Sequence, residues 1–470
     1  MIKRALLLAA IAAAPLAAQT HPAEQVAEER LKGDVETLVG FGTRHTLSVQ
    51  DNPERGIGAA VDWGLAEFKR IGAKCGGCLE VLPVGEVVPA DGRRIPADTL
   101  IRNAVAIQRG TERPNEVVIV QGHIDSRVSD VMDAVLDAPG ANDDGSGTAL
   151  VLEAARVLSG TKYPTTIIYA LLSGEEQGLY GGRILADWAE AQGFTVKAVL
   201  NNDIVGNSCG KDGYCEPKVV RVFSEGPRAD LTDALRAAQT RFGGENDTPS
   251  RNLSRWVAGL AEKHAGEMQV RQIWRTDRMG RGGDQVPFLQ KGYPAIRFSV
   301  GVEDYDHQHQ DLRTEDGVFY GDTIDEMDFA YLAGVTKLNV RALDALARAP
   351  MPPALTIDGA VKTYTDLTWT PVDGAHDYII FSRETFEPFW HLSNAISGTL
   401  QNGGKVTSHS EGDKPDGMIA VFENGLFKIR LVGVRADDSL FGVASCVGDL
   451  VCSPVSSAVP GGAFEPVGKE

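Results

Sequence analysis

Side chains that could hold a metal ion follow several short apolar stretches of the chain. Such stretches are typical of strands that are buried on both faces of a sheet. The metal-capable residues at and after their ends are His123, Asp125, Asp143, Glu175, Glu176, Asp203, His307 and His309. Imidazoles and carboxylates that meet at one place are the ligands that zinc and related divalent metals prefer. The sequence therefore predicts a metal centre, provided that the fold brings these segments together.

Strand-like and helix-like segments alternate around these residues. The expected strands are 79–84, 103–108, 117–120, 165–172, 196–201 and 294–300. The expected helices are 23–41, 58–71, 148–159, 183–191, 228–242, 251–265 and 329–348. This alternation predicts an α/β fold with a mostly parallel or mixed central sheet and helices on both faces. In open sheets of this kind, ligands bind beyond the carboxyl ends of the strands, so the side chains above should meet there.

The pattern changes near residue 350. Three prolines within 350–353 form a stiff linker, because closely spaced prolines cannot continue a helix. The segment 354–470 then contains short alternating strands, most clearly in 367–383, which predicts an all-β sandwich. We therefore expect an α/β domain over 19–349, a linker over 350–353 and a sandwich over 354–470.

The composition is that of a globular protein with a strongly acidic surface. Of the 470 residues, 43% are hydrophobic and 23% are charged, and the formal net charge is −18 at pH 7. An acidic surface repels phosphate backbones, and no basic stripe offsets it. We therefore do not expect a nucleic-acid partner.

The first eighteen residues are typical of a secretory signal. Lys3 and Arg4 precede an apolar run over 5–14, and the small residues at 16–18 offer a cleavage site. The apolar run is short for a membrane span. We expect cleavage, no integral membrane segment afterwards, and a periplasmic or secreted protein.

The six cysteines fall into three close pairs, which agrees with export to an oxidising compartment. The pairs are Cys75 with Cys78, Cys209 with Cys215, and Cys446 with Cys452. This spacing predicts three local disulfides. A zinc site or a redox motif on the first pair is the alternative.

Five segments, in order along the chain, resemble the zinc aminopeptidases of peptidase family M28. They are GHID, GANDDGSG, SGEEQGLYGG, NNDIVGN and GGDQVPFLQKGYPAIRF, and the resemblance covers roughly residues 35–347. It implies a zinc exopeptidase fold, with a bacterial, exported enzyme as the expectation. The C-terminal segment in turn resembles a fibronectin type III module. One departure is Gln285, which follows Asp284 where relatives often carry histidine.

The resemblance also implies a ligand set for two zinc ions. The implied ligands are His123, Asp143, Glu176, Asp203 and His309, with Asp143 bridging the two ions. His307 is the alternative to His309, and His309 is the choice because it follows Gln308 directly and lies four residues after Tyr305.

The implied catalytic residues are Glu175 and Asp125. Glu175 would be the general base, and Asp125 would hold the second ring nitrogen of His123 and so fix its tautomer. The peptide bond between Asp143 and Asp144 would be cis.

The implied reaction is hydrolysis of the N-terminal bond of a peptide that has a free N-terminus. Two zinc ions would activate a bridging water as the nucleophile. A carboxypeptidase is an alternative, because Arg271, Arg275, Arg278 and Arg281 could bind a C-terminal carboxylate. A one-zinc glutaminyl cyclase is another, and a binding protein on an inactive peptidase fold is a third.

Overall fold

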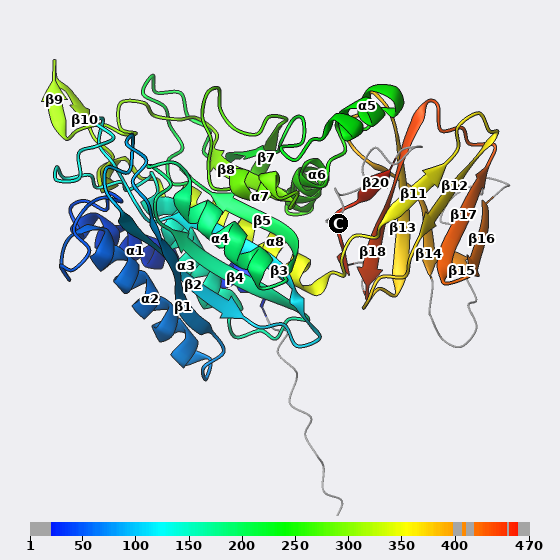
Figure 1. Cartoon of the computed structure of the whole chain (residues 1–470), viewed down its shortest axis with the longest axis horizontal. Helices are drawn as coiled ribbons and strands as arrows, with labels where there is room; N and C mark the ends of the chain where they lie inside the picture. Colours follow the sequence, from blue (N-terminus) through cyan, green and yellow to red (C-terminus); the bar gives the residue numbers. More distant parts are fainter. Residues whose placement is uncertain (1–19, 398–406, 410–417, 449–450, 459–470) are drawn as a thin grey trace, which may run out of the picture.

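The computed structural model describes residues 20–397, 407–409, 418–448 and 451–458 (Figure 1). The expected signal at 1–18 and the last twelve residues of the expected sandwich lie outside these residues. Within the described ranges, no helix is both long and apolar enough to cross a membrane.

A mixed eight-stranded sheet forms the centre of the first part of the chain, in the order β1-β2-β4-β3-β5-β8-β6-β7. Its middle strands β4, β3, β5 and β8 are parallel, and antiparallel pairs join β1 to β2, β2 to β4 and β6 to β8. The strands are β1 (Glu80–Val88), β2 (Thr99–Gln108), β3 (Arg113–His123), β4 (Thr165–Leu172), β5 (Thr195–Asn202), β6 (Val219–Phe223), β7 (Gln269–Ile273) and β8 (Ala295–Val300). The predicted α/β class with a mixed central sheet is confirmed.

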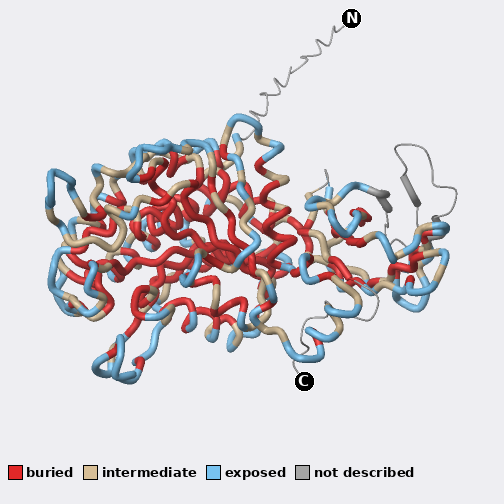
Figure 2. The backbone as a smooth tube through the Cα atoms, turned by 90° about the horizontal axis from the view of Figure 1, so that it is seen from above, coloured by how far each residue is buried: buried red, intermediate tan, exposed pale blue. Residues whose placement is uncertain are grey.

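Helices cover both faces of this sheet. Along β3, Val118 and Val120 belong to one hydrophobic core, and Val117 and Ile119 belong to a second one, because successive side chains point to opposite faces. The helices of the first core are α1 (Glu28–Gly40), α2 (Gly56–Lys74), α3 (Gly145–Leu158), α6 (Pro249–Glu262) and α8 (Phe329–Arg348). Those of the second are α4 (Tyr180–Ala191) and α7 (Val286–Gln290). Figure 2 shows the buried residues concentrated along this layered centre.

Some elements differ from those that the sequence predicts. The helix expected over 228–242 is α5 (Asp233–Phe242), which begins later because the side chain of Thr232 caps it by accepting a hydrogen bond from the Leu235 N–H. Strands β6 and β7 were not predicted, since each has only five residues and a central arginine. The small remaining elements are the hairpin β9 (Arg313–Glu315) and β10 (Val318–Tyr320) and the 3-10 helices η1 (Pro22–Gln25) and η2 (Ile324–Glu326).

The C-terminal part consists of two antiparallel sheets, which confirms its all-β class. One sheet contains β11 (Leu355–Asp358), β12 (Tyr364–Trp369), β16 (Met418–Glu423) and β17 (Leu426–Val432). The other contains β13 (Asp377–Glu384), β14 (His391–Ser397), β15 (Thr407–His409), β18 (Ser439–Val447), β19 (Val451–Cys452) and β20 (Ser456–Ala458). The rings of Trp369, Tyr378 and Phe427 pack against one another in the core of this part.

The C-terminal sheets lie beside α5 and α6 of the first part (Figure 1). Asp247 connects the two parts through buried ion pairs with Arg255 of α6 and Arg383 of β13. Trp390 also donates a hydrogen bond of 3.0 Å to Asn252. Buried pairs of this kind fix the relative position of the two parts, because losing one partner would leave a charge without compensation.

The three predicted disulfides are confirmed. They join Cys75 to Cys78, Cys209 to Cys215 and Cys446 to Cys452. Since Cys75 and Cys78 are bonded to each other, their thiols are not available as zinc ligands.

Candidate metal centre

Three neighbouring strands deliver most of the predicted site residues to one edge of the sheet. His123 is the last residue of β3, Asp203 follows the end of β5, and Glu175 and Glu176 come shortly after β4. Because β3 runs parallel to both β4 and β5, the carboxyl ends of the three strands lie next to one another. This is the edge at which open α/β sheets bind ligands.

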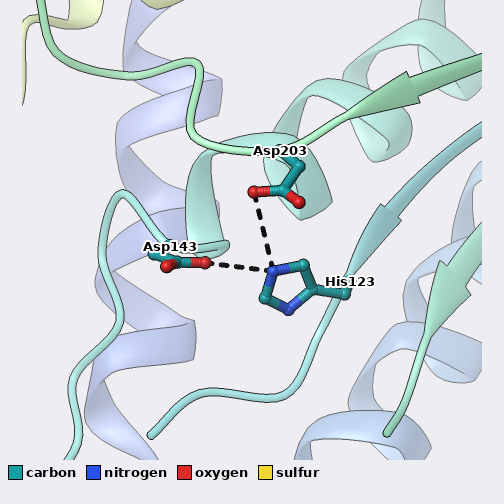
Figure 3. A group of neighbouring side chains, drawn as sticks. All are labelled: His123, Asp143 and Asp203. Carbon is teal, nitrogen blue, oxygen red and sulfur yellow. Dashed lines mark ion pairs between the residues drawn. The ribbon is translucent and has the colours of Figure 1, made fainter. Parts of the chain in front are cut away.

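Asp143 reaches the same place from the segment just before α3. Figure 3 shows its carboxylate and that of Asp203 facing the same ring nitrogen of His123. The His123 Nε2 lies 3.0 Å from Asp143 Oδ1 and 3.9 Å from Asp203 Oδ1. These three buried residues form the first ligand group.

Asp143, Glu176 and His309 form the second ligand group. The His309 Nε2 lies 2.7 Å from Asp143 Oδ2 and 2.9 Å from Glu176 Oε1. The two oxygens of Asp143 therefore face different imidazoles, and this carboxylate belongs to both groups.

His307 does not join either of these groups. Its Nδ1 lies 3.0 Å from Asp304 Oδ2, and its Nε2 lies 3.4 Å from Glu326 Oε1. The structure therefore places His309, and not His307, beside the shared carboxylate.

The donor atoms fit zinc. Zinc bonds to nitrogen and oxygen are about 2 Å long, so two ligands of one ion lie roughly 3–4 Å apart. The atoms that each group offers all lie within 4.8 Å of one another. Each group combines one imidazole with two carboxylates, a donor set that suits divalent zinc.

The first group is supported by fully buried partners. Arg297 pairs with Asp203 Oδ1 at 2.8 Å and with Asp277 Oδ2 at 2.7 Å. Gln285, the residue that departs from the M28 pattern, donates a hydrogen bond of 3.1 Å to the same oxygen of Asp277. It therefore helps to hold the partner of Arg297.

Asp125 contacts both His123 and the turn that follows β4. Its main-chain carbonyl lies 3.0 Å from His123 Nδ1, nearer than its carboxylate oxygen Oδ1 at 3.5 Å. The carboxylate also accepts hydrogen bonds from the main-chain N–H groups of Glu175 and Glu176, at 3.3 and 3.2 Å, and from Thr46 Oγ1 at 2.8 Å. The sequence predicted the link to His123, but it gave no signal that Asp125 also positions the turn after β4.

The segment around Asp143 is fixed by two further carboxylates. The peptide bond between Asp143 and Asp144 is cis, as the resemblance implied. Asp322 accepts hydrogen bonds from the N–H groups of Asn142 and Asp143, at 2.8 and 2.7 Å. Asp144 caps α3 through the Gly147 N–H and also accepts a hydrogen bond of 2.9 Å from the His123 N–H.

The second group is supported by arginines and by a loop. The Arg127 Nε donates to Glu176 Oε2 at 2.7 Å, and its Nη2 lies 2.5 Å from His309 Nδ1. Arg94 donates to the main-chain carbonyl of Glu176. The backbone of His309 has a φ of 57°, in the left-handed region that few non-glycine residues adopt. Arg127 could have been suspected from its position directly after GHIDS.

Burial and neighbouring charges set the protonation of the site. Burial acts to raise the pKa of Asp143, but the imidazoles of His309 and His123 outweigh it and hold the pKa well below its usual range. Although Glu175 is partly exposed, the surrounding protein and the neighbouring carboxylate of Glu176 raise its pKa well above the usual value. Several carboxylates therefore meet two imidazoles at the centre, a combination of groups that suits a bound divalent cation.

A small pocket opens beside Asp143. Its carboxylates are Asp143, Glu303, Asp304, Asp322 and Glu326, and its other lining residues are Asn142, Ile204, Asn207, His307 and Gln308. Burial raises the pKa of Asp322 to about 7. Glu303 pairs with Arg221 and Arg278, so the remaining acidity of the wall comes mainly from Asp304 and Glu326.

The fold and the paired ligand groups define an α/β protein with a candidate divalent-metal centre at the carboxyl edge of its sheet. The sequence profile of peptidase family M28 matches residues 103–316. A probable zinc metalloprotease of Leptosphaeria maculans is 42% identical over 88% of this chain and 94% of its own length. One of Pyrenophora teres is 45% identical over 78% of this chain and 77% of its own length. The chain therefore belongs to peptidase family M28 and is a metallopeptidase, for which the family implies zinc.

Solved structures agree on the fold. The crystal structure of the LapA aminopeptidase of Legionella pneumophila has a TM-score of 0.50 and 18% identity, and it covers 73% of this chain and 80% of that chain. At this identity the likeness concerns the fold alone. The two curated relatives above are fungal, so they lend no support to the expected bacterial source. The expected likeness to fibronectin type III likewise gains no support from them.

Proposed function

We propose that this metallopeptidase is a two-zinc aminopeptidase that removes the N-terminal residue of peptides. The observation that carries the proposal is the sharing of Asp143 between two ligand groups, each with its own imidazole. A single-zinc site needs only one such group, so this arrangement favours two ions over the one-zinc glutaminyl cyclase chemistry.

The proposed ligands are His123, Asp143 and Asp203 for one ion, and Asp143, Glu176 and His309 for the other. Zinc ions held there would polarise the scissile carbonyl and lower the pKa of an attacking water towards about 7. The protein's contribution is to fix the donor atoms with buried partners, as Arg297 does for Asp203.

Glu175 is the proposed general base. It follows β4 directly before Glu176, and it belongs to neither ligand group. Its main-chain N–H donates to Asp125, which fixes the backbone of Glu175 beside the ligand Glu176. Glu175 would accept a proton from the attacking water and deliver it to the leaving amine.

The acidic pocket beside Asp143 supports recognition of a free N-terminus. An ammonium group placed there would meet the carboxylates of Asp304 and Glu326, with His307 between them. Two of the arginines considered for a carboxypeptidase are already engaged elsewhere. Arg271 pairs with Glu216, and Arg278 pairs with Asp277 and Glu303.

We also propose that the protein is exported. The three disulfides support an oxidising compartment. The acidic net charge of −18 gives no support to a nucleic-acid partner.

The test is the Glu175→Gln variant. We expect its kcat to fall roughly 10²- to 10⁴-fold, the usual contribution of a general base, while elemental analysis still finds two zinc ions per chain. The same assay should show that N-acetylated peptides are not hydrolysed. The matched control is Glu86→Gln, on the exposed side of β1, which should keep the activity of the native protein. Full turnover by Glu175→Gln would remove this residue from its role, and hydrolysis of acetylated peptides would rule out an aminopeptidase.

A further inference from the structure

Side chains of both charges surround the metal centre. The pocket beside Asp143 is acidic. The arginines Arg127 and Arg94 both contact Glu176, a residue of the second ligand group. A substrate bound at the centre would therefore have both negative and positive groups nearby.

Arg127 has donors to spare. Its contacts with Glu176, His309 and the carbonyl of Val128 use three of its five N–H bonds among the described residues. Its side chain is 16% exposed, so solvent and small ligands can reach it. A planar guanidinium with free N–H bonds is the group that best matches a carboxylate.

Arg94 comes from the turn between β1 and β2 and is exposed. Its Nη1 donates to the carbonyl of Glu176, which brings a second guanidinium to this residue. Arg297, which pairs with Asp203 of the first group, is fully buried and so less accessible.

Arg127 lies close enough to the centre to contact a very short peptide. Its guanidinium contacts Glu176 and His309, which both belong to the second ligand group. Two extended residues span roughly 7 Å, so a dipeptide whose scissile bond lies at the centre would bring its carboxylate within reach of this guanidinium. In a long peptide, the C-terminal carboxylate would lie far beyond the arginines.

We propose that Arg127, assisted by Arg94, binds the C-terminal carboxylate of the substrate, so that the enzyme prefers zwitterionic dipeptides over longer peptides. This inference rests on the proposed aminopeptidase function and adds a substrate class to it. The acidic pocket selects the free N-terminus, and the arginines select a carboxylate one residue beyond the scissile bond.

The test compares alanylalanine with its C-terminal amide, which lacks only the negative charge. For the zinc-loaded native protein, we expect kcat/KM to be roughly ten- to hundred-fold higher for the free acid, as for a charge-assisted hydrogen bond. In Arg127→Ala this ratio should fall to near one. Any effect of Arg127 on Glu176 changes the rates of both substrates equally, so it cancels in the ratio.

Conservative and matched variants distinguish a role in binding the carboxylate from a role in holding the metal centre together. Arg127→Lys should keep part of the preference, because it retains the charge but not the planar fork. Arg94→Ala should reduce the ratio severalfold, whereas Arg109→Ala, at the opposite end of the same hairpin, should leave it unchanged, since Arg109 pairs with Glu80. If Arg127→Ala loses its zinc, Arg127→Lys and Arg94→Ala decide the question.

Binding gives a second readout that does not need turnover. In the Glu175→Gln variant, calorimetric titration should show that the amide binds more weakly than alanylalanine. Adding the substitution Arg127→Lys should reduce this difference in affinity between the two ligands. The inference would be overturned if the native protein had nearly equal kcat/KM values for the acid and the amide, or if the variants of Arg127 and Arg94 left their ratio unchanged. Neither result would contradict the proposed aminopeptidase function. Hydrolysis of N-acetylalanylalanine would instead overturn the aminopeptidase.

Discussion

The two ligand groups share Asp143, but different parts of the fold hold them. In the first group, His123 ends a central strand and Asp203 follows another, and the fully buried Arg297 pairs with Asp203. In the second group, His309 belongs to the loop before β9, and its side chain is 15% exposed. Its arginine partner, Arg127, also reaches solvent.

One half of the centre is therefore rigid and the other half is adaptable. Strand ends inside a packed sheet have few alternative positions, so the donor atoms of the first group are already arranged. The loop of His309 has fewer buried contacts, and segments of that kind open more readily. We therefore expect the ion of the second group to exchange faster than the ion of the first.

Asp143→Asn should have the largest effect, because Asp143 belongs to both groups. We expect the zinc content to fall towards zero, and the loss of several kcal/mol of transition-state stabilisation to reduce kcat/KM on the order of a thousand-fold or more. Elemental analysis and a peptide assay measure both effects. The control is Asp187→Asn on the exposed side of α4, where the carboxylate pairs with Lys291 and with no other cation among the described residues. Two zinc ions in Asp143→Asn would show that the halves are independent.

His309→Ala should have a smaller effect on metal content, since it removes a ligand of one group only. We expect one zinc per chain to remain, bound by His123 and its partners, and hydrolysis to be lost. His307→Ala is the matched control, because His307 lies two positions away and contacts Asp304 and Glu326 instead. If the two variants exchange these outcomes, the assignment of the second group is wrong.

Arg297→Lys should have the smallest effect, and a selective one. Lysine keeps the charge but cannot span Asp203 and Asp277 with a planar fork, so the zinc affinity of the first group should fall roughly 10- to 100-fold. Arg127→Lys should weaken the second group instead. Competition with a chelator, followed over time, measures the two affinities separately. If either variant lowered the zinc affinity of both groups equally, the conclusion that Arg297 and Arg127 support different groups would be wrong.

Much of the candidate centre could be predicted from the sequence, because its residues follow recognisable strands. His123, Asp203 and the pair Glu175–Glu176 each come at or soon after the end of an apolar run. Parallel strands bring such ends to one edge of a sheet, so their convergence follows from the alternation of strands and helices. His309 could be preferred over His307 only by resemblance, because both lie in the same polar loop.

Other residues of the centre could not be predicted, for lack of any local pattern. Asp322 holds the N–H of Asp143 across 179 residues of sequence. Arg297 sits inside a strand, where nothing in the sequence distinguishes it from an exposed basic residue. The strands β6 and β7 were missed for a similar reason, since pairing with β8 and with each other decides their conformation more than their own five residues do.

The sequence by itself determined the α/β class, the C-terminal all-β part, the three disulfides and the set of metal-capable side chains. Each of these depends on composition, on periodicity or on spacing between neighbours in the chain. The resemblance implied that two groups share Asp143, but only the tertiary structure decided that its two oxygens face different imidazoles, that Arg297 supports one group, and that Arg127 supports the other. Those contacts join residues far apart in sequence, and their geometry depends on how the elements pack, which no local pattern records.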